Sequence, residues 1–122
     1  GGEGADVVYD PVGGSYSEPA IRATAWEGRF LVIGFAAGPI PKIPLNLALL
    51  KNCQIVGVFW GAYTARDPKG HQGNLAELMT MFKAKQLRPH ISATYPLEKA
   101  ADALNDMGSR KVKGKVVLTV AR

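Results

Sequence analysis

The sequence contains one cysteine, Cys53, in 122 residues. A single thiol excludes an internal disulfide and a zinc site built from cysteines, so we expect a reducing, cytoplasmic setting. The two histidines, His71 and His90, do not have the spacing of metal ligands. No apolar run reaches the ~18 residues of a membrane helix, so no membrane span is expected. The start of the sequence is glycine-rich and acidic, unlike a signal peptide.

Several motifs that identify an active site are also missing. No G-x-G-x-x-G or Walker A sequence opens a helix after a strand, and no serine lies in a nucleophile elbow. The early carboxylates Asp6, Asp10 and Glu18 do not form a recognisable acid–base pair. We expect Asp6 and Asp10 to mark the ends of a strand. The sequence therefore identifies no catalytic residue and no metal ligand.

Charge and composition suit a globular domain with a modest core. Hydrophobic residues make up 47% of the chain, and the formal net charge is +5. Much of the positive excess lies late in the sequence, at Lys83, Lys85, Arg88, Arg110, Lys111, Lys113, Lys115 and Arg122. A solvated face is the simplest interpretation; attraction to a phosphorylated ligand or a nucleic acid is the alternative.

Short apolar strands alternate with helices of about ten residues, which is the βαβ pattern of a parallel α/β sheet. Strands are predicted over residues 6–10, 29–35, 54–60, 91–95 and 115–120. Helices are predicted over residues 17–26, 45–51, 75–86 and 97–107, the last with Ala100, Ala101 and Leu104 facing inward. Ser17 and Asn74 are expected to be N-caps, Gly28 to stop the first helix, and residues 61–73 to form a loop.

The first three strands end in turns of small residues, PVGG, AAGP and WGAY. In open α/β sheets the ligand lies beyond the carboxyl ends of the strands, so these turns predict a site. Each candidate has a simpler explanation. Gly13 could serve an ordinary turn, Gly34 a bulge or tight packing, Phe59 and Trp60 core packing, and Gly114-Lys115 a solvated loop.

The order of the motifs resembles a known family. The segments GADVVYDPVGG, EGRFLVIGFAAG, IPLNLALLKNCQIVGVFWG and YPLEKAADALNDMGSRKVKGKVVL closely resemble the medium-chain dehydrogenase/reductases, in the zinc-independent quinone oxidoreductase branch that includes zeta-crystallin. The resemblance covers essentially the whole chain. It implies an α/β fold: the C-terminal half of a Rossmann-type, doubly wound parallel sheet at residues 1–90. Residues 91–122 would return to a catalytic domain outside this sequence.

The resemblance also implies a site and an activity. The cofactor, NADPH without a metal, would lie against Val12, Gly13, Ile33, Gly34, Phe35, Val58, Phe59, Trp60, Gly61, Gly114 and Lys115. The parent protein would transfer hydride to quinones or conjugated carbonyls and form a homodimer, whereas this piece alone would be inactive. Two alternatives stay open: an enoyl-thioester or alkenal reductase of the same superfamily, and a non-enzymatic RNA-binding or structural protein. Nucleic acid is the less expected partner.

Overall fold

The computed structural model describes residues 2–120, which fall into two compact units. The first unit extends to His71, and the second begins at Gln72. This division lies inside a helix, some way before residue 90, where the sequence suggests a boundary; the functional assignment of residues 91–122 stays a proposal. Each unit is described by itself.

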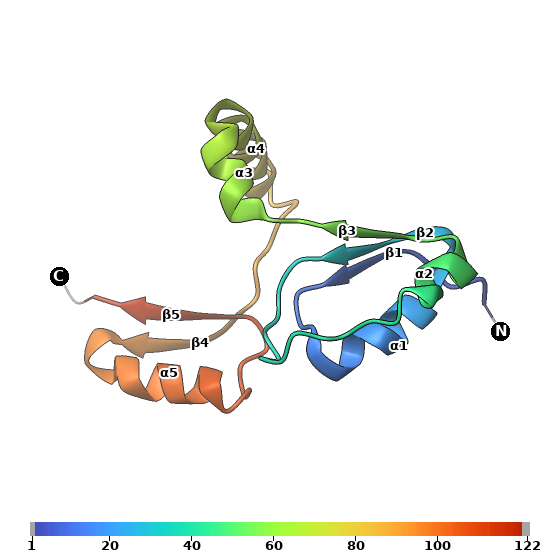
Figure 1. Ribbon diagram of the computed structural model, residues 1–122. Helices are drawn as coiled ribbons and strands as arrows, with labels where there is room; N and C mark the ends of the chain where they lie inside the picture. Colours follow the sequence, from blue (N-terminus) through green and yellow to red (C-terminus); the bar gives the residue numbers. More distant parts are fainter. Residues whose placement is uncertain (1, 121–122) are drawn as a thin grey trace. The chain divides into compact units, whose positions relative to one another are not determined.

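Three parallel strands form the sheet of the first unit, in the order β1-β2-β3 (Figure 1). These strands are β1 (Ala5–Asp10), β2 (Thr24–Val32) and β3 (Gln54–Gly57). The short 3-10 helix η1 (Gly14–Tyr16) and helix α1 (Ser17–Arg22) connect the first two strands, and helix α2 (Asn46–Lys51) precedes the third. The expected parallel α/β sheet is therefore confirmed.

The core of this unit lies between the sheet and its two helices. Helices α1 and α2 lie on the same side of the strands (Figure 1), and each contributes one buried side chain, Ile21 and Leu47, that packs against Phe30 of β2. Val8 of β1 is partly buried against the same cluster. Burying each of these large side chains contributes about 1.5–3 kcal/mol, so this small cluster holds the sheet and helices together.

The boundary between α1 and β2 differs from the prediction. The helix ends at Arg22, and the strand already begins at Thr24, which pairs with Ala5 of β1. The register shifts between Ala5 and Val7, where β2 carries extra residues and Glu27 adopts a φ of 58°. Gly28 does not stop the helix; it lies within β2, where an added Cβ would be only 2.7 Å from Thr24 Cγ2. The pairing of Thr24 with β1 therefore sets the end of the helix, which the local helix signals in the sequence do not predict.

A second correction concerns residues 58–73. Strand β3 ends at Gly57, helix α3 spans Trp60–Arg66, and helix α4 spans Pro68–Lys83. The predicted loop is wrong because Pro68 occupies the first helical position, where no N–H is needed. The carboxylate of Asp67 accepts a hydrogen bond of 2.9 Å from the N–H of Gly70, which satisfies one free donor of the new helix. Asn74 consequently lies inside α4 and is not its N-cap.

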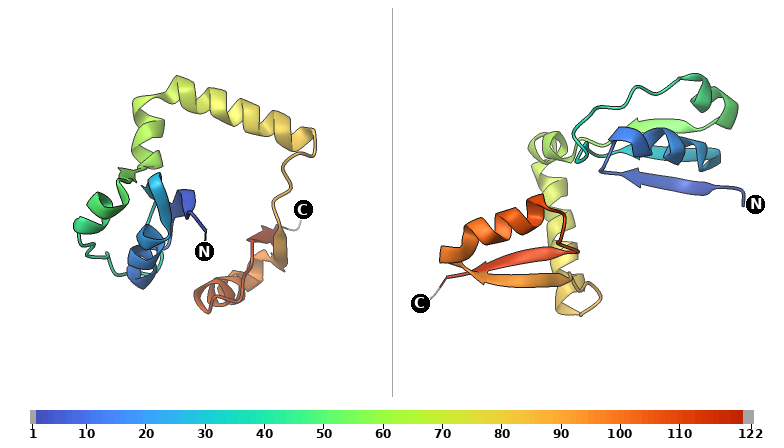
Figure 2. Two further views of the ribbon diagram at one scale, coloured as in Figure 1. Left: turned by 90° about the vertical axis from the view of Figure 1, so that its right-hand side faces the viewer. Right: turned by 90° about the horizontal axis from the view of Figure 1, so that it is seen from below.

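The second unit contains a strand–helix–strand motif (Figure 2). Strand β4 (Ile91–Pro96) is followed by the 3-10 helix η2 (Leu97–Lys99), helix α5 (Ala100–Gly108) and strand β5 (Lys115–Thr119), and the two strands are parallel. The buried residue of α5 is Ala103, whereas Leu104 is 67% exposed, so the predicted inward face is wrong.

One side-chain hydrogen bond joins β4 to α5 in this unit. The hydroxyl of Tyr95 donates to Asp106 Oδ2 at 2.5 Å, and Lys111 Nζ lies 3.4 Å from the other carboxylate oxygen. The Tyr95 hydroxyl and the Lys111 ammonium lower the pKa of Asp106, and the same carboxylate raises the pKa of Tyr95. The bond is best formed with an ionised Asp106 and a protonated Tyr95.

Candidate functional site

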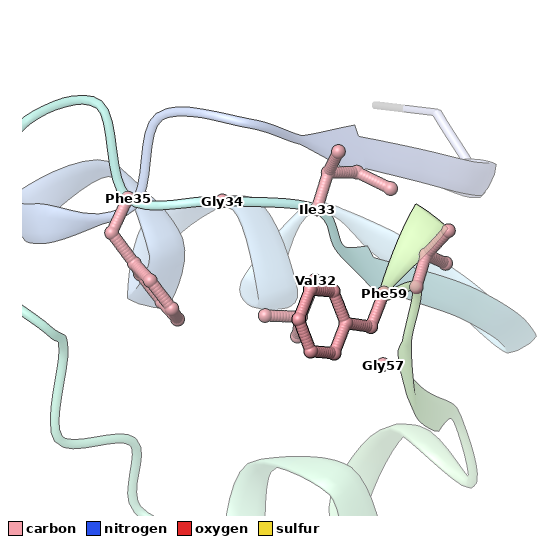
Figure 3. A pocket seen from close by; sticks show the side chains of 7 residues that line it. Val32, Ile33, Gly34, Phe35, Gly57 and Phe59 are labelled. Carbon is pink, nitrogen blue, oxygen red and sulfur yellow. The ribbon is translucent and has the colours of Figure 1, made fainter. Parts of the chain in front are cut away.

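The carboxyl ends of the three parallel strands meet at one edge of the first unit. Asp10 pairs with Val32, and Val32 pairs with Gly57, so β1, β2 and β3 end side by side. Beyond this edge lies a pocket of ≈ 440 Å³ (Figure 3). Its lining residues are Val32, Ile33, Gly34, Phe35, Gly57, Val58 and Phe59. The structure thus has a pocket at the edge where parallel sheets bind ligands.

The structure brings five of the predicted site residues together in this pocket. These are Ile33, Gly34, Phe35, Val58 and Phe59. Val12 and Gly13 lie in the adjacent turn, outside the lining. Trp60 and Gly61 begin α3, and the ring of Trp60 meets the ring of His71 edge-on at 5.5 Å. Gly114 and Lys115 belong to the second unit, where the N–H of Lys115 donates to the carbonyl of His90.

The pocket is apolar and carries no titratable side chain. Its two aromatic residues come from different strand ends, Phe35 after β2 and Phe59 after β3 (Figure 3). Phe35 is 40% exposed and Phe59 is 80% exposed. Such a wall can orient a flat ring and exclude water from it, but it cannot supply or accept a proton. The chemistry would therefore have to come from a bound group, with the protein positioning it.

Two glycines line the pocket at positions where the fold does not require glycine. A Cβ added to Gly34 would lie 3.4 Å from the carbonyl oxygen of Pro11, an ordinary contact, and one added to Gly57 would meet nothing within 4 Å. Neither residue has a positive φ. The explanation of Gly34 by tight packing is therefore weak, and the pair suits a ligand that approaches the backbone closely.

Gly13 is different, because the fold explains it. Its φ is 69°, and an added Cβ would lie 2.8 Å from Cδ1 of Phe35. A side chain at this position would be strained and would push Phe35 out of place. Gly13 therefore allows Phe35 to pack closely against the turn after β1, although Gly13 itself does not line the pocket.

Asp10 has a larger structural role than its sequence context predicts. It ends β1 as expected, but it is only 8% exposed and its carboxylate accepts hydrogen bonds from the N–H groups of Val12 and Gly13 and from the hydroxyl of Ser17. Burial raises the pKa of Asp10, but these three bonds outweigh that effect, so its pKa is lowered. Ser17 is the first residue of α1 and bonds this carboxylate instead of capping the helix. An aspartate just before a proline–glycine turn was the available signal.

Among residues 2–120, no group of three or more histidine, cysteine, aspartate or glutamate side chains could hold a metal ion. Within the same residues, no helix is both long and apolar enough to cross a membrane.

Comparison with known proteins gives consistent matches. The family described as "Zinc-binding dehydrogenase" matches residues 1–118. The quinone oxidoreductase-like protein 2 homolog of Nematostella vectensis is 39% identical over 118 residues, which cover 96% of this chain and 32% of the relative. Quinone oxidoreductase-like protein 2 of Rattus norvegicus is 38% identical over 120 residues, or 98% of this chain and 34% of the relative.

A solved structure agrees with these relatives. A mycobacterial protein in complex with NADPH superposes with a TM-score of 0.83 at 26% identity, covering 95% of this chain and 35% of the other. The expected fold, the C-terminal part of a Rossmann-type oxidoreductase, is thereby confirmed. The chain spans about a third of the length of the curated relatives it matches.

Proposed function

The chain belongs to the zinc-binding dehydrogenase family, and we propose that it forms the cofactor-facing part of an NADPH-dependent quinone oxidoreductase among the medium-chain dehydrogenase/reductases. The observation that supports this most is the pair of glycines, Gly34 and Gly57, on an apolar pocket at the carboxyl edge of a parallel sheet. A relative in complex with NADPH and relatives named quinone oxidoreductase-like point to the same ligand class.

The residues of the pocket fit the nicotinamide end of the cofactor. Gly34 would let the ring approach the backbone, and Phe35 and Phe59 would orient it and keep water away. NADPH, when bound, supplies a hydride to a quinone or another conjugated carbonyl. The proposal retains the other predicted contacts, at Val12, Gly13, Ile33, Val58, Trp60, Gly61, Gly114 and Lys115. Zinc-independence is part of the proposal and depends on the resemblance to zeta-crystallin.

The activity itself can be measured directly. We expect the full-length protein that contains this chain to oxidise NADPH in the presence of a soluble quinone, with a turnover above about 1 s⁻¹. The isolated 122-residue chain should show none, because it lacks a glycine-rich loop for the diphosphate. The measurement is the loss of NADPH absorbance, with a heat-inactivated sample as control.

Two results would contradict this proposal: full-length protein that is inert toward every quinone tested, or an isolated chain that turns over. Parallel assays with a conjugated ketone and with an enoyl thioester would separate the quinone reductase from the alternative reductases.

We also propose a homodimer through the open edge of β3. This strand pairs only with β2 in the first unit, and an unpaired edge recruits another strand. The N–H of Val58 donates to the carbonyl of Val32 in β2. Successive N–H groups of an extended chain point to opposite sides, so the N–H of Ile55, three residues earlier, points to the open edge. Ile55→Pro should therefore convert a dimer of the full-length protein into a monomer in light scattering, while Ile55→Val remains dimeric. A monodisperse wild-type monomer at high concentration would contradict the proposal.

A further inference from the structure

Asp10 bonds two separate segments at the edge of the pocket. Its side chain holds the turn that follows β1: Oδ1 accepts from the N–H of Val12 at 2.9 Å and from that of Gly13 at 2.8 Å. Its main-chain carbonyl holds the end of β2, where it accepts from the N–H of Ile33 at 3.0 Å and of Gly34 at 3.3 Å. The second pair of donors lines the pocket.

The two segments remain paired beyond Asp10. The carbonyl of Pro11 accepts from the N–H of Ala36 at 3.1 Å, and that of Val12 accepts from Ala37 at 2.8 Å. Gly13 lies so close to Phe35 that an added Cβ would be 2.8 Å from its ring. The turn after β1 therefore holds residues 35–37, at the end of the pocket wall, by two main-chain hydrogen bonds and by the contact of Gly13 with Phe35.

The carboxylate itself is not available to a ligand. Its second oxygen, Oδ2, accepts a hydrogen bond of 2.7 Å from the hydroxyl of Ser17, and the residue does not line the pocket. Because the Asp10 side chain does not line the pocket and is bonded to the turn and to Ser17, we infer its effect on a bound ligand through the turn.

We propose that Asp10 is a positioning residue for the cofactor pocket: its carboxylate fixes the turn through Gly13, and the turn fixes Gly34 and Phe35 on the pocket wall. This inference depends on the proposed function only in naming NADPH as the ligand. If Asp10 only stabilised the first unit, its loss would lower the stability of that unit but leave the NADPH affinity of the folded molecules unchanged. Measuring the affinity of folded variants therefore tests the proposal.

Three variants of the full-length protein separate the two roles. Asp10→Ala leaves the N–H groups of Val12 and Gly13 without their acceptor. Asp10→Asn keeps a carbonyl oxygen for both donors, and its amide can donate to the hydroxyl of Ser17, which can turn to accept. Ser17→Ala removes one hydrogen bond from the same carboxylate and leaves the turn bonds in place.

The first readout is the NADPH dissociation constant from a fluorescence titration, at a temperature where each variant is folded. We expect Asp10→Ala to raise it at least about tenfold, which corresponds to about 1.4 kcal/mol. Asp10→Asn and Ser17→Ala should stay within about threefold of wild type. Equal affinities in Asp10→Ala and wild type would overturn the proposal, as would equal losses in Asp10→Ala and Ser17→Ala. If the alanine variant does not fold, Asp10→Leu, which has a similar branched shape but no acceptor oxygen for the turn, replaces it with the same criteria.

The second readout needs no cofactor. Amide hydrogen exchange in Asp10→Ala should accelerate at Gly13 and Gly34 more than at Phe30 and Leu31 in the middle of β2. Uniform acceleration over all four residues would show that Asp10 only stabilises the unit, and would overturn the proposal. If the wild-type protein does not bind NADPH, the proposed function fails, and the exchange experiment still decides the role of Asp10.

Discussion

Gly34→Val in the full-length protein should weaken NADPH binding by roughly 5- to 150-fold, a loss of about 1–3 kcal/mol of the kind that overpacking causes. The valine would add bulk to a residue that lines the pocket beside Phe35. The fold should tolerate it, since the nearest protein atom to an added Cβ is the carbonyl oxygen of Pro11 at 3.4 Å. Fluorescence titration with NADPH measures the affinity, and melting curves measure the stability.

Ala37→Val is the matched control for this experiment. Ala37 lies in the loop after the same strand, its N–H also bonds the turn after β1, and it does not line the pocket. We expect the control to bind NADPH within about threefold of wild type. If Gly34→Val folds normally and binds NADPH as tightly as the control, then Gly34 is not a cofactor contact and the pocket has been assigned to the wrong ligand.

Gly114→Ala should destabilise the second unit by about 2–4 kcal/mol. A Cβ added to Gly114 would run into the carbonyl oxygen of His90 and would lie 2.9 Å from its Cδ2. Because that carbonyl also accepts the N–H of Lys115 at 2.8 Å, β5 could move away only by losing this bond. Thermal unfolding, together with amide hydrogen exchange of β4 and β5, measures the effect.

The same unit offers a control, Gly108→Ala. Gly108 is the last residue of α5, nothing lies within 4 Å of an added Cβ, and alanine favours a helix by about 1 kcal/mol over glycine. This variant should be neutral or stabilising. A Gly114→Ala protein that is as stable as wild type but binds NADPH weakly would contradict the packing explanation. It would instead favour the cofactor contact that the resemblance implies for Gly114.

Gly34 and Gly114 illustrate why the role of a glycine is difficult to predict from sequence. Gly34 and Gly114 both follow or precede a strand in a segment that resembles the family, and both were assigned to the cofactor on that basis. The structure distinguishes them, because an added Cβ at Gly114 would overlap the carbonyl of His90, whereas one at Gly34 would make an ordinary contact and Gly34 lines a pocket. The distances that separate them join residues far from each other along the chain, as between Gly114 and His90.

Some features could be predicted well from the sequence. The strands at 6–10, 91–95 and 115–120 were predicted to within a few residues, because each is an apolar, β-branched run between turn residues. Their alternation with helices predicted a parallel sheet and a site at its carboxyl edge, where the structure has a pocket lined by five of the predicted residues. These results depend on local periodicity, which the sequence displays directly.

Two boundaries were missed for different reasons. The pairing of Ala5 with Thr24, a long-range contact, shortened α1. The start of α4 at Asp67 and Pro68 is a local signal, to which the prediction gave less weight than to the neighbouring glycines.

The bonds of Asp10 to Val12, Gly13 and Ser17 are local in sequence, but its burial could not be predicted. A strand-end aspartate looks the same in sequence whether its carboxylate is exposed or buried. By itself, the sequence determined the order of strands and helices and the edge that carries the site. Only the folded chain decided which glycines leave room for a ligand and whether the Asp10 carboxylate is buried, because the packing around a residue depends on atoms brought together from distant segments.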